Sequence, residues 1–304
     1  MSRAALTQRA AIASVCTAVL LLALKGWAAW VTGSVAMLGS LADTGLDLVA
    51  SLVTLFSVRY AAQPADTEHR FGHGKAEALA ALFQVMLISI SACGIAVQAV
   101  RRLIAGDVSA NAEYGIGVSI AALAATLLLI AYQRHVIRQT NSVAITADNV
   151  HYQSDLLLNG SVIAALVLDQ YLGLTGADPV FGVLIALWLL YGALRASTTA
   201  INQLMDREWP EEKRQRFLAI AAQQPELLGI HDLRTRSSGA QDFVQFHVWV
   251  RPDMTVAEAH AISEGVEQKL MAAFPDTEIL IHLDPEGQID RLGEPDEALR
   301  ETPE

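Results

Sequence analysis

The chain has 304 residues, 53% of them hydrophobic and only 17% charged, and its mean hydropathy is +0.35. This balance excludes an ordinary soluble domain and indicates a membrane protein. The formal net charge is −11. Residues 1–204 hold 11 basic and 11 acidic residues, whereas the chain from Met205 onward holds 10 and 21. The acidic excess therefore belongs to the C-terminal part, and a generally basic face that binds nucleic acid is excluded.

Six segments are apolar enough to cross a membrane as helices, which takes roughly 20 residues each. They are 10–31, 34–58, 77–100, 114–132, 145–168 and 179–200. Lys25 interrupts the first, so we expect an uncleaved span rather than a signal peptide. Six spans put both termini on one side of the membrane. Most of the flanking arginines and lysines fall on that side by alternation, with Arg101 and Arg102 as exceptions, so the positive-inside rule predicts cytoplasmic termini.

The pattern changes to that of a soluble domain at Pro210. A helix is expected over 210–224, strands over 229–236 and 242–250, a second helix over 255–274 and a third strand over 277–284. This α-β-β-α-β order predicts a small ferredoxin-like α+β domain. The expected organisation is therefore an all-α six-helix transmembrane domain over 1–204, a cytoplasmic domain over 205–288, and an acidic, mostly disordered tail over 289–304.

Two pairs of ionisable residues lie inside predicted spans. Asp43 and Asp47 are four residues apart in the second span, and His151 and Asp155 repeat this spacing in the fifth, so each pair shares one helix face. An ionised group at membrane depth costs ~2.5–3.5 kcal/mol, and three carboxylates cost on the order of 8–10 kcal/mol. Because Lys25 is near the far end of its span, we expect no cation at the same depth.

A bound divalent metal ion is therefore the expected partner of these carboxylates. Three carboxylates and one imidazole can close a tetrahedron around Zn²⁺, and Fe²⁺, Co²⁺, Cd²⁺ or Mn²⁺ also accept such ligands. The alternative is that the polar pairs hydrogen-bond helices together or form a proton relay.

Two further groups of candidate metal ligands lie outside the spans. Asp66, His69 and His73 are spaced by three and four residues between the second and third spans, which places them on one turn; the alternative is a solvated polar loop. In the last strand, alternation puts His282 and Asp284 on one face. The other histidines of this domain, His231, His247 and His260, join His282 and Asp284 in the second group. Four histidines with an aspartate predict a metal cluster rather than separate surface histidines.

The chain resembles the cation diffusion facilitator family, in particular its bacterial YiiP-like branch of ferrous-iron and zinc efflux proteins. The passages that carry the resemblance are TGSVAMLGSLADTGLDLVASL, QPADTEHRFGHGKAEALAAL, ADNVHYQSDLLLNG, GIHDLRTRSSG and ILIHLDP, and the similarity covers nearly the whole chain. It implies a Y-shaped homodimer in the cell inner membrane that exchanges a divalent metal ion for protons by alternating access.

The resemblance also implies a role for each candidate residue. It assigns Asp43, Asp47, His151 and Asp155 to the transport site, and Asp66, His69 and His73 to a loop site. It assigns a binuclear cytoplasmic site, with Asp284 bridging, to His231, His247, His260, His282 and Asp284. It implies a charge pair between protomers, Lys75 with Asp206. The histidine at 151 favours zinc or iron over manganese.

The expected function is a metal/proton antiporter that exports zinc from the cytoplasm, with ferrous iron or cadmium as alternative substrates. Two other classes stay open from the residues. A membrane metalloenzyme is disfavoured because HExxH is absent and the four protein ligands leave no position for water. A membrane metal sensor or buffer would bind ions without moving them, and a flux assay separates it from a transporter.

Overall fold

The structure, a computed structural model, describes residues 2–32, 35–105, 116–172, 177–223, 227–287 and 300–301. The chain divides into two compact units, Met1–Ile201 and Asn202–Glu304, which are described separately below.

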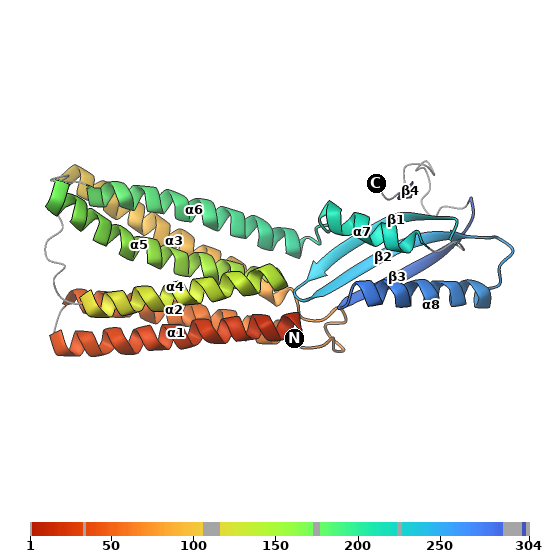
Figure 1. The fold of residues 1–304 in the computed structure, drawn as a ribbon, viewed down its shortest axis with the longest axis horizontal. Helices are drawn as coiled ribbons and strands as arrows, with labels where there is room; N and C mark the ends of the chain where they lie inside the picture. The colour runs from red at the N-terminus through yellow and green to blue at the C-terminus, as the bar shows by residue number, and fades with distance from the viewer. Residues whose placement is uncertain are drawn as a thin grey trace. The chain divides into compact units, whose positions relative to one another are not determined.

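The first unit is built from six long helices, labelled in Figure 1. Their bounds are α1 Arg3–Thr32, α2 Val35–Ala61, α3 Ala76–Ala105, α4 Ile116–Thr140, α5 Val143–Leu172 and α6 Ala177–Leu204. With 25–30 residues each, all six are long enough to cross a bilayer. The six-helix fold expected from the sequence is confirmed, and the helices extend beyond the apolar segments because helical structure continues into the flanking polar turns.

Five of these helices also meet the composition of a membrane span over the described residues, namely α1, α2, α3, α4 and α6. Helix α5 is as long as α1 and α3, but it carries Asp148, Asn149, His151 and Asp155 within eight residues. Helix α5 therefore carries most of the candidate chemistry of the bundle.

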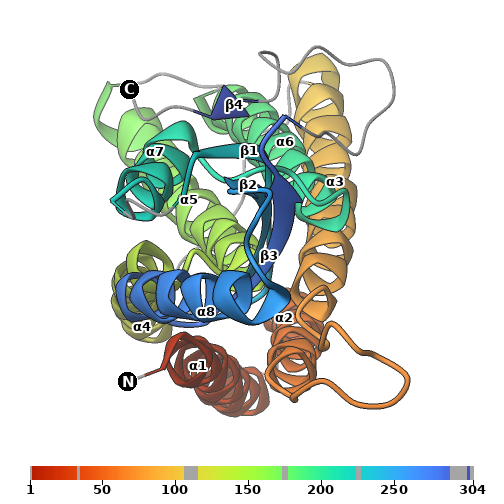
Figure 2. The same ribbon diagram turned by 90° about the vertical axis from the view of Figure 1, so that its right-hand side faces the viewer.

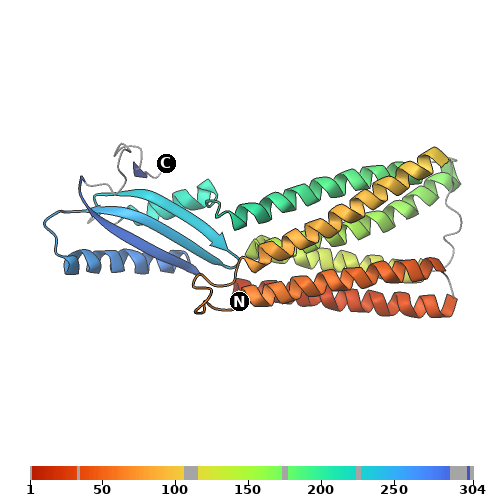
Figure 3. The same cartoon turned by 180° about the vertical axis from the view of Figure 1, so that it is seen from behind.

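The helices of the bundle fall into two groups (Figures 1 and 3): α1, α2 and α4 lie together, as do α3, α5 and α6. The second group shares an apolar core of Ile88, Ala92, Ile185 and Leu189, with Val150 packed against it. Small residues allow close approach, since a Cβ on Gly182 would lie 3.0 Å from the Cβ of Ala99 and one on Gly192 would lie 3.2 Å from Val150. The two groups meet at one end of the bundle, where Ala10, Leu55, Ala80, Val136 and Ile145 form a common core.

The second unit is a four-stranded sheet with two helices on one face. Its elements are α7 Glu211–Ala221, β1 Gly229–Ser238, β2 Gln241–Val250, α8 Val256–Ala273, β3 Thr277–Pro285 and β4 Arg300–Glu301. The strand order is β3-β2-β1-β4, with β2 and β3 parallel and the other pairs antiparallel. Figure 2 shows α7 and α8 on the same side of the sheet. The predicted α-β-β-α-β order is therefore confirmed.

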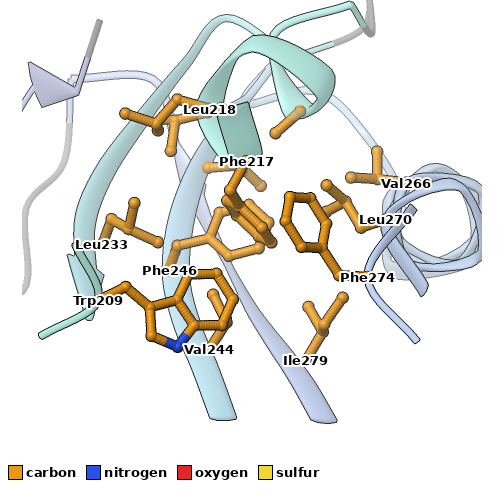
Figure 4. Packing of buried hydrophobic residues seen from close by; sticks show 13 residues of the cluster. Trp209, Phe217, Leu218, Leu233, Val244, Phe246, Val266, Leu270, Phe274 and Ile279 are labelled. Carbon is orange, nitrogen blue, oxygen red and sulfur yellow. The ribbon is translucent and has the colours of Figure 1, made fainter. Parts of the chain in front are cut away.

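The core of this unit explains why its opposite face is polar. Phe217 from α7 packs against Phe246 of β2 and Phe274 at the end of α8, as Figure 4 shows. Alternation along β2 buries Val244, Phe246 and Val248 in this core, so His247 points to the other face. A capping box between Thr255 and Glu258 fixes the start of α8.

The tail was predicted to be mostly disordered. Within it the structure describes only Arg300–Glu301, which form the edge strand β4 beside Ile230 and His231. Residues 288–299 and 302–304 lie outside the described part of the chain.

Candidate metal sites

The predicted transport residues come together in the bundle as a cluster of three. Asp47 of α2 and His151 and Asp155 of α5 each offer one ligand atom, and these atoms lie within 4.8 Å of one another. His151 Nε2 is 3.0 Å from Asp47 Oδ1 and 4.0 Å from Asp155 Oδ2. Because α2 and α5 belong to different helix groups, this cluster connects the two groups. His151 is buried, with 8% of its surface exposed, so its ring has little access to other partners.

Asp43, the fourth predicted member, stands outside this cluster. It is exposed, one helical turn before Asp47 on the same face of α2. The structure therefore brings together three of the four residues, with Asp43 within one turn of them.

Lys25 lies much closer to these carboxylates than the sequence suggested. Its Nζ donates a 2.7 Å hydrogen bond to the hydroxyl of Thr44, the residue that follows Asp43. The prediction that no cation lies at the depth of the carboxylates is wrong, because α1 and α2 are consecutive antiparallel helices. Lys25 is seven residues before the end of α1 and Thr44 nine after the start of α2, so their depths match.

Sequence reasoning also missed Asp148, which is fully buried one turn before His151. Its carboxylate accepts hydrogen bonds from Ser14 of α1 at 2.6 Å, Gln133 of α4 at 2.7 Å and Gln84 of α3 at 3.2 Å. Four helices therefore converge on a single side chain, which fixes α5 close to the cluster. The signal in the sequence was two glutamines at apolar segments, Gln84 inside the third predicted span and Gln133 directly after the fourth.

Tyr152 continues this network towards α2. Its hydroxyl pairs with Ser51 Oγ at 2.8 Å and donates to the carbonyl of Ser14 at 3.2 Å. The ring of Tyr152 packs edge-on against that of His151, with centroids 5.7 Å apart. The orientation of His151 is thus supported by a buried neighbour tied to two other helices.

The predicted loop residues form a second cluster between α2 and α3. Candidate ligand atoms of Asp66, His69 and His73 lie within 4.8 Å of one another. Asp66 is 3.5 Å from His69 Nδ1 and 3.3 Å from His73 Nε2. His73 is buried against Tyr60, whereas the other two side chains are about half exposed. This segment is a tight turn in which the N–H of Gly72, at φ 74°, donates to the carbonyl of His69.

The carboxylate of Asp66 also organises its own turn. It accepts hydrogen bonds from the backbone N–H of His69 at 2.6 Å and of Glu68 at 2.9 Å. The first of these is the main reason that the pKa of Asp66 lies below its ordinary value of 3.8. A carboxylate held in its charged form by backbone donors is suited to a cation.

The third cluster is a row of histidines across the polar face of the sheet. His231, His247 and His282 are register partners on the adjacent strands β1, β2 and β3. Asp284, only 4% exposed, lies one pleat further along β3. Its Oδ2 is 3.1 Å from His231 Nε2 and 2.9 Å from His247 Nδ1, and its Oδ1 is 3.2 Å from His282 Nε2. Both carboxylate oxygens therefore face imidazole nitrogens, a donor set that suits a bridging carboxylate.

Three further residues of the second unit bear on this third cluster. Asp232, which the sequence reasoning did not single out, adopts a φ of 48° at a bulge in β1, and its carboxylate lies 3.9 Å from His247 Nε2. His260 is exposed on α8 and is not brought into the group of His231, His247 and Asp284. Trp249 stacks on the ring of His231 with centroids 4.2 Å apart and holds that ring in place.

The predicted charge pair between protomers stays a prediction. Lys75 immediately precedes α3 in the first unit. Asp206 belongs to the second unit, where its carboxylate lies 3.5 Å from Arg236.

The bundle defines this chain as a multi-pass membrane protein with a separate α/β domain. Comparisons with known sequences identify the protein family. The family model for the cation efflux transmembrane domain matches residues 11–205. The model for the cytoplasmic domain of cation efflux proteins matches residues 209–286.

Curated relatives match over nearly their whole length. The cation-efflux pump FieF of Cronobacter sakazakii is 46% identical over 280 residues, which cover 92% of this chain and 93% of the relative. FieF of Yersinia pestis is 46% identical over 276 residues, 91% and 92% of the two chains.

Solved structures match the second unit. The Zn form of CzrB is 38% identical and covers 28% of this chain and 99% of its own, with a TM-score of 0.27. The metal-bound C-terminal domain of the CzcD transporter from Thermotoga maritima is 22% identical and covers 27% and 99%, with a TM-score of 0.25.

The chain therefore belongs to the cation diffusion facilitator family of cation efflux proteins, as the sequence motifs predicted. Members of this family are membrane transporters of divalent metal ions and not enzymes, so the metalloenzyme alternative is excluded. The C-terminal domain is the dimerisation domain of the family, and the partners of this chain accordingly include a second copy of itself.

Proposed function

We propose that this protein is a proton-coupled exporter of divalent metal ions, with zinc as the preferred substrate. The observation that carries the proposal is the cluster of Asp47, His151 and Asp155 between two helix groups of a membrane bundle. Asp43 joins them as the fourth ligand by a side-chain rotation within one turn of α2. A set of three carboxylates and one imidazole fits tetrahedral Zn²⁺, and it also accepts Fe²⁺, Cd²⁺, Co²⁺ or Mn²⁺.

Proton coupling follows from the chemistry of these ligands. Each ligand must be deprotonated to bind metal, so metal binding releases protons and protonation releases metal. Imidazole is the side chain whose ordinary pKa, about 6.5, lies in the physiological range. His151 contacts both Asp47 and Asp155, and a proton on its ring can therefore replace the ion as the positive partner of both carboxylates.

The position of the cluster supports alternating access. Asp47 belongs to the group α1, α2 and α4, whereas His151 and Asp155 belong to the group α3, α5 and α6. A rocking motion between the groups changes the access to a site whose ligands come from both. We place the termini in the cytoplasm from the basic residues near Arg59 and Arg138, which end α2 and α4, and the protein in the inner membrane of its cell.

We assign the other two clusters to metal binding outside the transport path. Asp66, His69 and His73 form the loop site, and the C-terminal cluster, bridged by Asp284, forms a binuclear site at the dimer interface with His231, His247, His260 and His282. The carboxylate and imidazole donors of both sites suit Zn²⁺. Filling of the C-terminal site regulates transport only if it changes the affinity or rate at the transport site.

The test is competitive metal uptake into proteoliposomes loaded at a different pH. The wild type should take up Zn²⁺, with Fe²⁺ and Cd²⁺ as competitors, and alkalinise the lumen in proportion, because protons leave as the metal enters. Asp47→Ala, His151→Ala and Asp155→Ala should each abolish metal-driven proton flux. Normal flux in His151→Ala and Asp155→Ala would remove the site assignment. Tight binding without any flux in the wild type would instead identify a metal sensor or buffer.

A further inference from the structure

Lys25 is a charged side chain next to the proposed transport site that is not one of the proposed metal ligands. It is half-buried on α1, and its ammonium group donates to Thr44 Oγ1 at 2.7 Å. Thr44 is fully buried, and its hydroxyl in turn donates to the carbonyl of Ser40 at 3.1 Å. The oxygen of Thr44 is therefore oriented to accept, and the ammonium group is held at a fixed place on α2.

This place lies on α2 between the two aspartates that this helix contributes to the proposed site. Thr44 directly follows Asp43 and lies one turn before Asp47. Asp155 of α5 lies with Asp47 in the same cluster of candidate ligands. Helices α1 and α2 approach closely here, since a Cβ on the neighbouring Gly26 would lie 3.7 Å from Leu41. The ammonium group thus lies in the wall of the site and not in a solvated loop.

Counting charges shows what the ammonium group changes. Asp43, Asp47 and Asp155 contribute −3, and once the metal has left, Lys25 reduces the total charge to −2. Charge inside a membrane bundle is costly, so the ammonium group stabilises the empty site. A fixed cation also repels a divalent ion, because the two positive charges share the same carboxylates.

We propose that Lys25 is the resident counter-charge of the transport site: it offsets the carboxylates when the metal has left and weakens metal binding enough for release. This inference rests on the proposed transport function, and it assigns Lys25 a positioning and affinity-setting role rather than that of a ligand. A residue that merely held α1 against α2 would, when replaced, loosen the site and weaken metal binding. Loss of a repelling charge would instead strengthen metal binding.

The experiment compares Lys25→Met, Lys25→Arg, Asp47→Ala and the double variant Lys25→Met/Asp47→Ala in the full-length dimer. Zn²⁺ binding is measured in detergent by competition with a fluorescent chelator, and the binding that disappears in Asp47→Ala is assigned to the transport site. For that site, Lys25→Met should bind Zn²⁺ roughly tenfold more tightly, which corresponds to about 1.4 kcal/mol. Lys25→Arg, which keeps the charge, should stay within about twofold of the wild type. The double variant should show no tight site.

Transport kinetics provide the second measurement. In proteoliposomes, Lys25→Met should lower KM and kcat for Zn²⁺ together, because the ion binds more tightly and leaves more slowly. If Asp47→Ala abolishes tight Zn²⁺ binding but Lys25→Met binds Zn²⁺ as tightly as the wild type or more weakly, the inference about Lys25 is overturned while the assignment of the transport site stands. If Asp47→Ala leaves Zn²⁺ binding unchanged, both the assignment of the transport site and the role of Lys25 are overturned. Should Lys25→Met melt at a much lower temperature than the wild type, Lys25→Gln replaces it with the same expected sign.

Discussion

The hydroxyl of Ser14 donates a 2.6 Å hydrogen bond to the carboxylate of Asp148, 134 residues further along the chain. Gln133 Nε2 lies 2.9 Å from the same hydroxyl and 2.7 Å from the same carboxylate, so the three side chains form a closed triangle. This buried triangle joins α1, α4 and α5 without any metal.

Asp148→Ala should destabilise the bundle more than other single carboxylate replacements. It leaves the donors of Ser14, Gln84 and Gln133 without their shared acceptor, and an unsatisfied buried donor costs about 1–3 kcal/mol. Because Ser14 and Gln133 keep their mutual contact, we expect a total loss on the order of 3 kcal/mol in the free energy of unfolding, measured in detergent micelles. Asp148→Asn, which keeps one oxygen, should lose less. Asp43→Ala is the matched control, and an equal loss there would contradict the special role of Asp148.

Asp43 and Asp47 should not be equivalent in metal binding. Asp47 contacts His151 at 3.0 Å, whereas Asp43 is exposed and must rotate to join the cluster. Asp47→Ala should therefore abolish Zn²⁺ binding at the transport site, and Asp43→Ala should weaken it by roughly ten- to a hundredfold, the range for loss of a supporting interaction at a metal site. Calorimetric titration of both variants measures the difference. Equal affinities would show that Asp43 is as essential as Asp47 to the bound state.

The turn around Asp66 should be stable well into the acid range. The pKa of Asp66 is lowered mainly by the backbone N–H of His69, so its stabilising effect is present above the ordinary value of 3.8 and is lost as the pH falls below it. Amide exchange at Glu68 and His69 in the metal-free protein should thus show constant protection from pH 7 to pH 4.5. Asp66→Asn should lose protection at all of these pH values. Opening of the wild-type turn near pH 6 would contradict this account.

Gly229→Ala should perturb the histidine row without touching a candidate ligand. A Cβ at this position would lie 2.7 Å from the ring of Trp249, which is buried and stacked on His231. The ring must shift, and such overpacking costs about 1–3 kcal/mol. We expect a change in tryptophan fluorescence, lower stability and weaker Zn²⁺ binding in the C-terminal domain. The control Gly265→Ala meets no atom within 4 Å and should leave Zn²⁺ binding unchanged.

Replacement of His260 should affect metal binding at the C-terminal cluster differently from replacement of Asp284. Asp284→Ala takes away the acceptor shared by three imidazoles, so it should abolish metal binding at that cluster in monomer and dimer alike. His260 is exposed and outside the cluster within one chain, so His260→Ala should reduce binding only if it reaches a site completed by the second copy. Zn²⁺ stoichiometry measured against protein concentration separates these cases. A loss in His260→Ala that is independent of dimerisation would contradict the geometry.

The sequence predicted most of the architecture because the features that determine it are periodic. Apolar length identified the spans that correspond to α1, α2, α3, α4 and α6. The span that corresponds to α5 was also predicted, despite Asp148, His151 and Asp155, because apolar residues resume after them. Alternation in β2 and β3 placed His247 and His282 on the polar face, and the observed register makes them neighbours. These predictions needed only the geometry of single elements.

The errors concern relationships between elements. The matching depth of Lys25 and Thr44 follows from the turn between α1 and α2, but judging each span separately put Lys25 at the wrong end. Asp148 was overlooked because its partners Ser14, Gln84 and Gln133 lie on three different helices, and no spacing within one helix reveals them. Nor could the sequence show that Asp43 stands apart from Asp47, since a side-chain rotamer decides it.

The hydrogen-bond partners of Asp148 have a consequence for the biosynthesis of the protein. Helix α5 carries the fully buried carboxylate of Asp148, and its partners Ser14, Gln84 and Gln133 all precede it in the chain. When α5 emerges from the ribosome, every donor that satisfies its buried carboxylate has already been made. Insertion of α5 can therefore be assisted by α1, α3 and α4, and the order of the helices along the chain lets the span that carries Asp148 enter a membrane that already contains its partners.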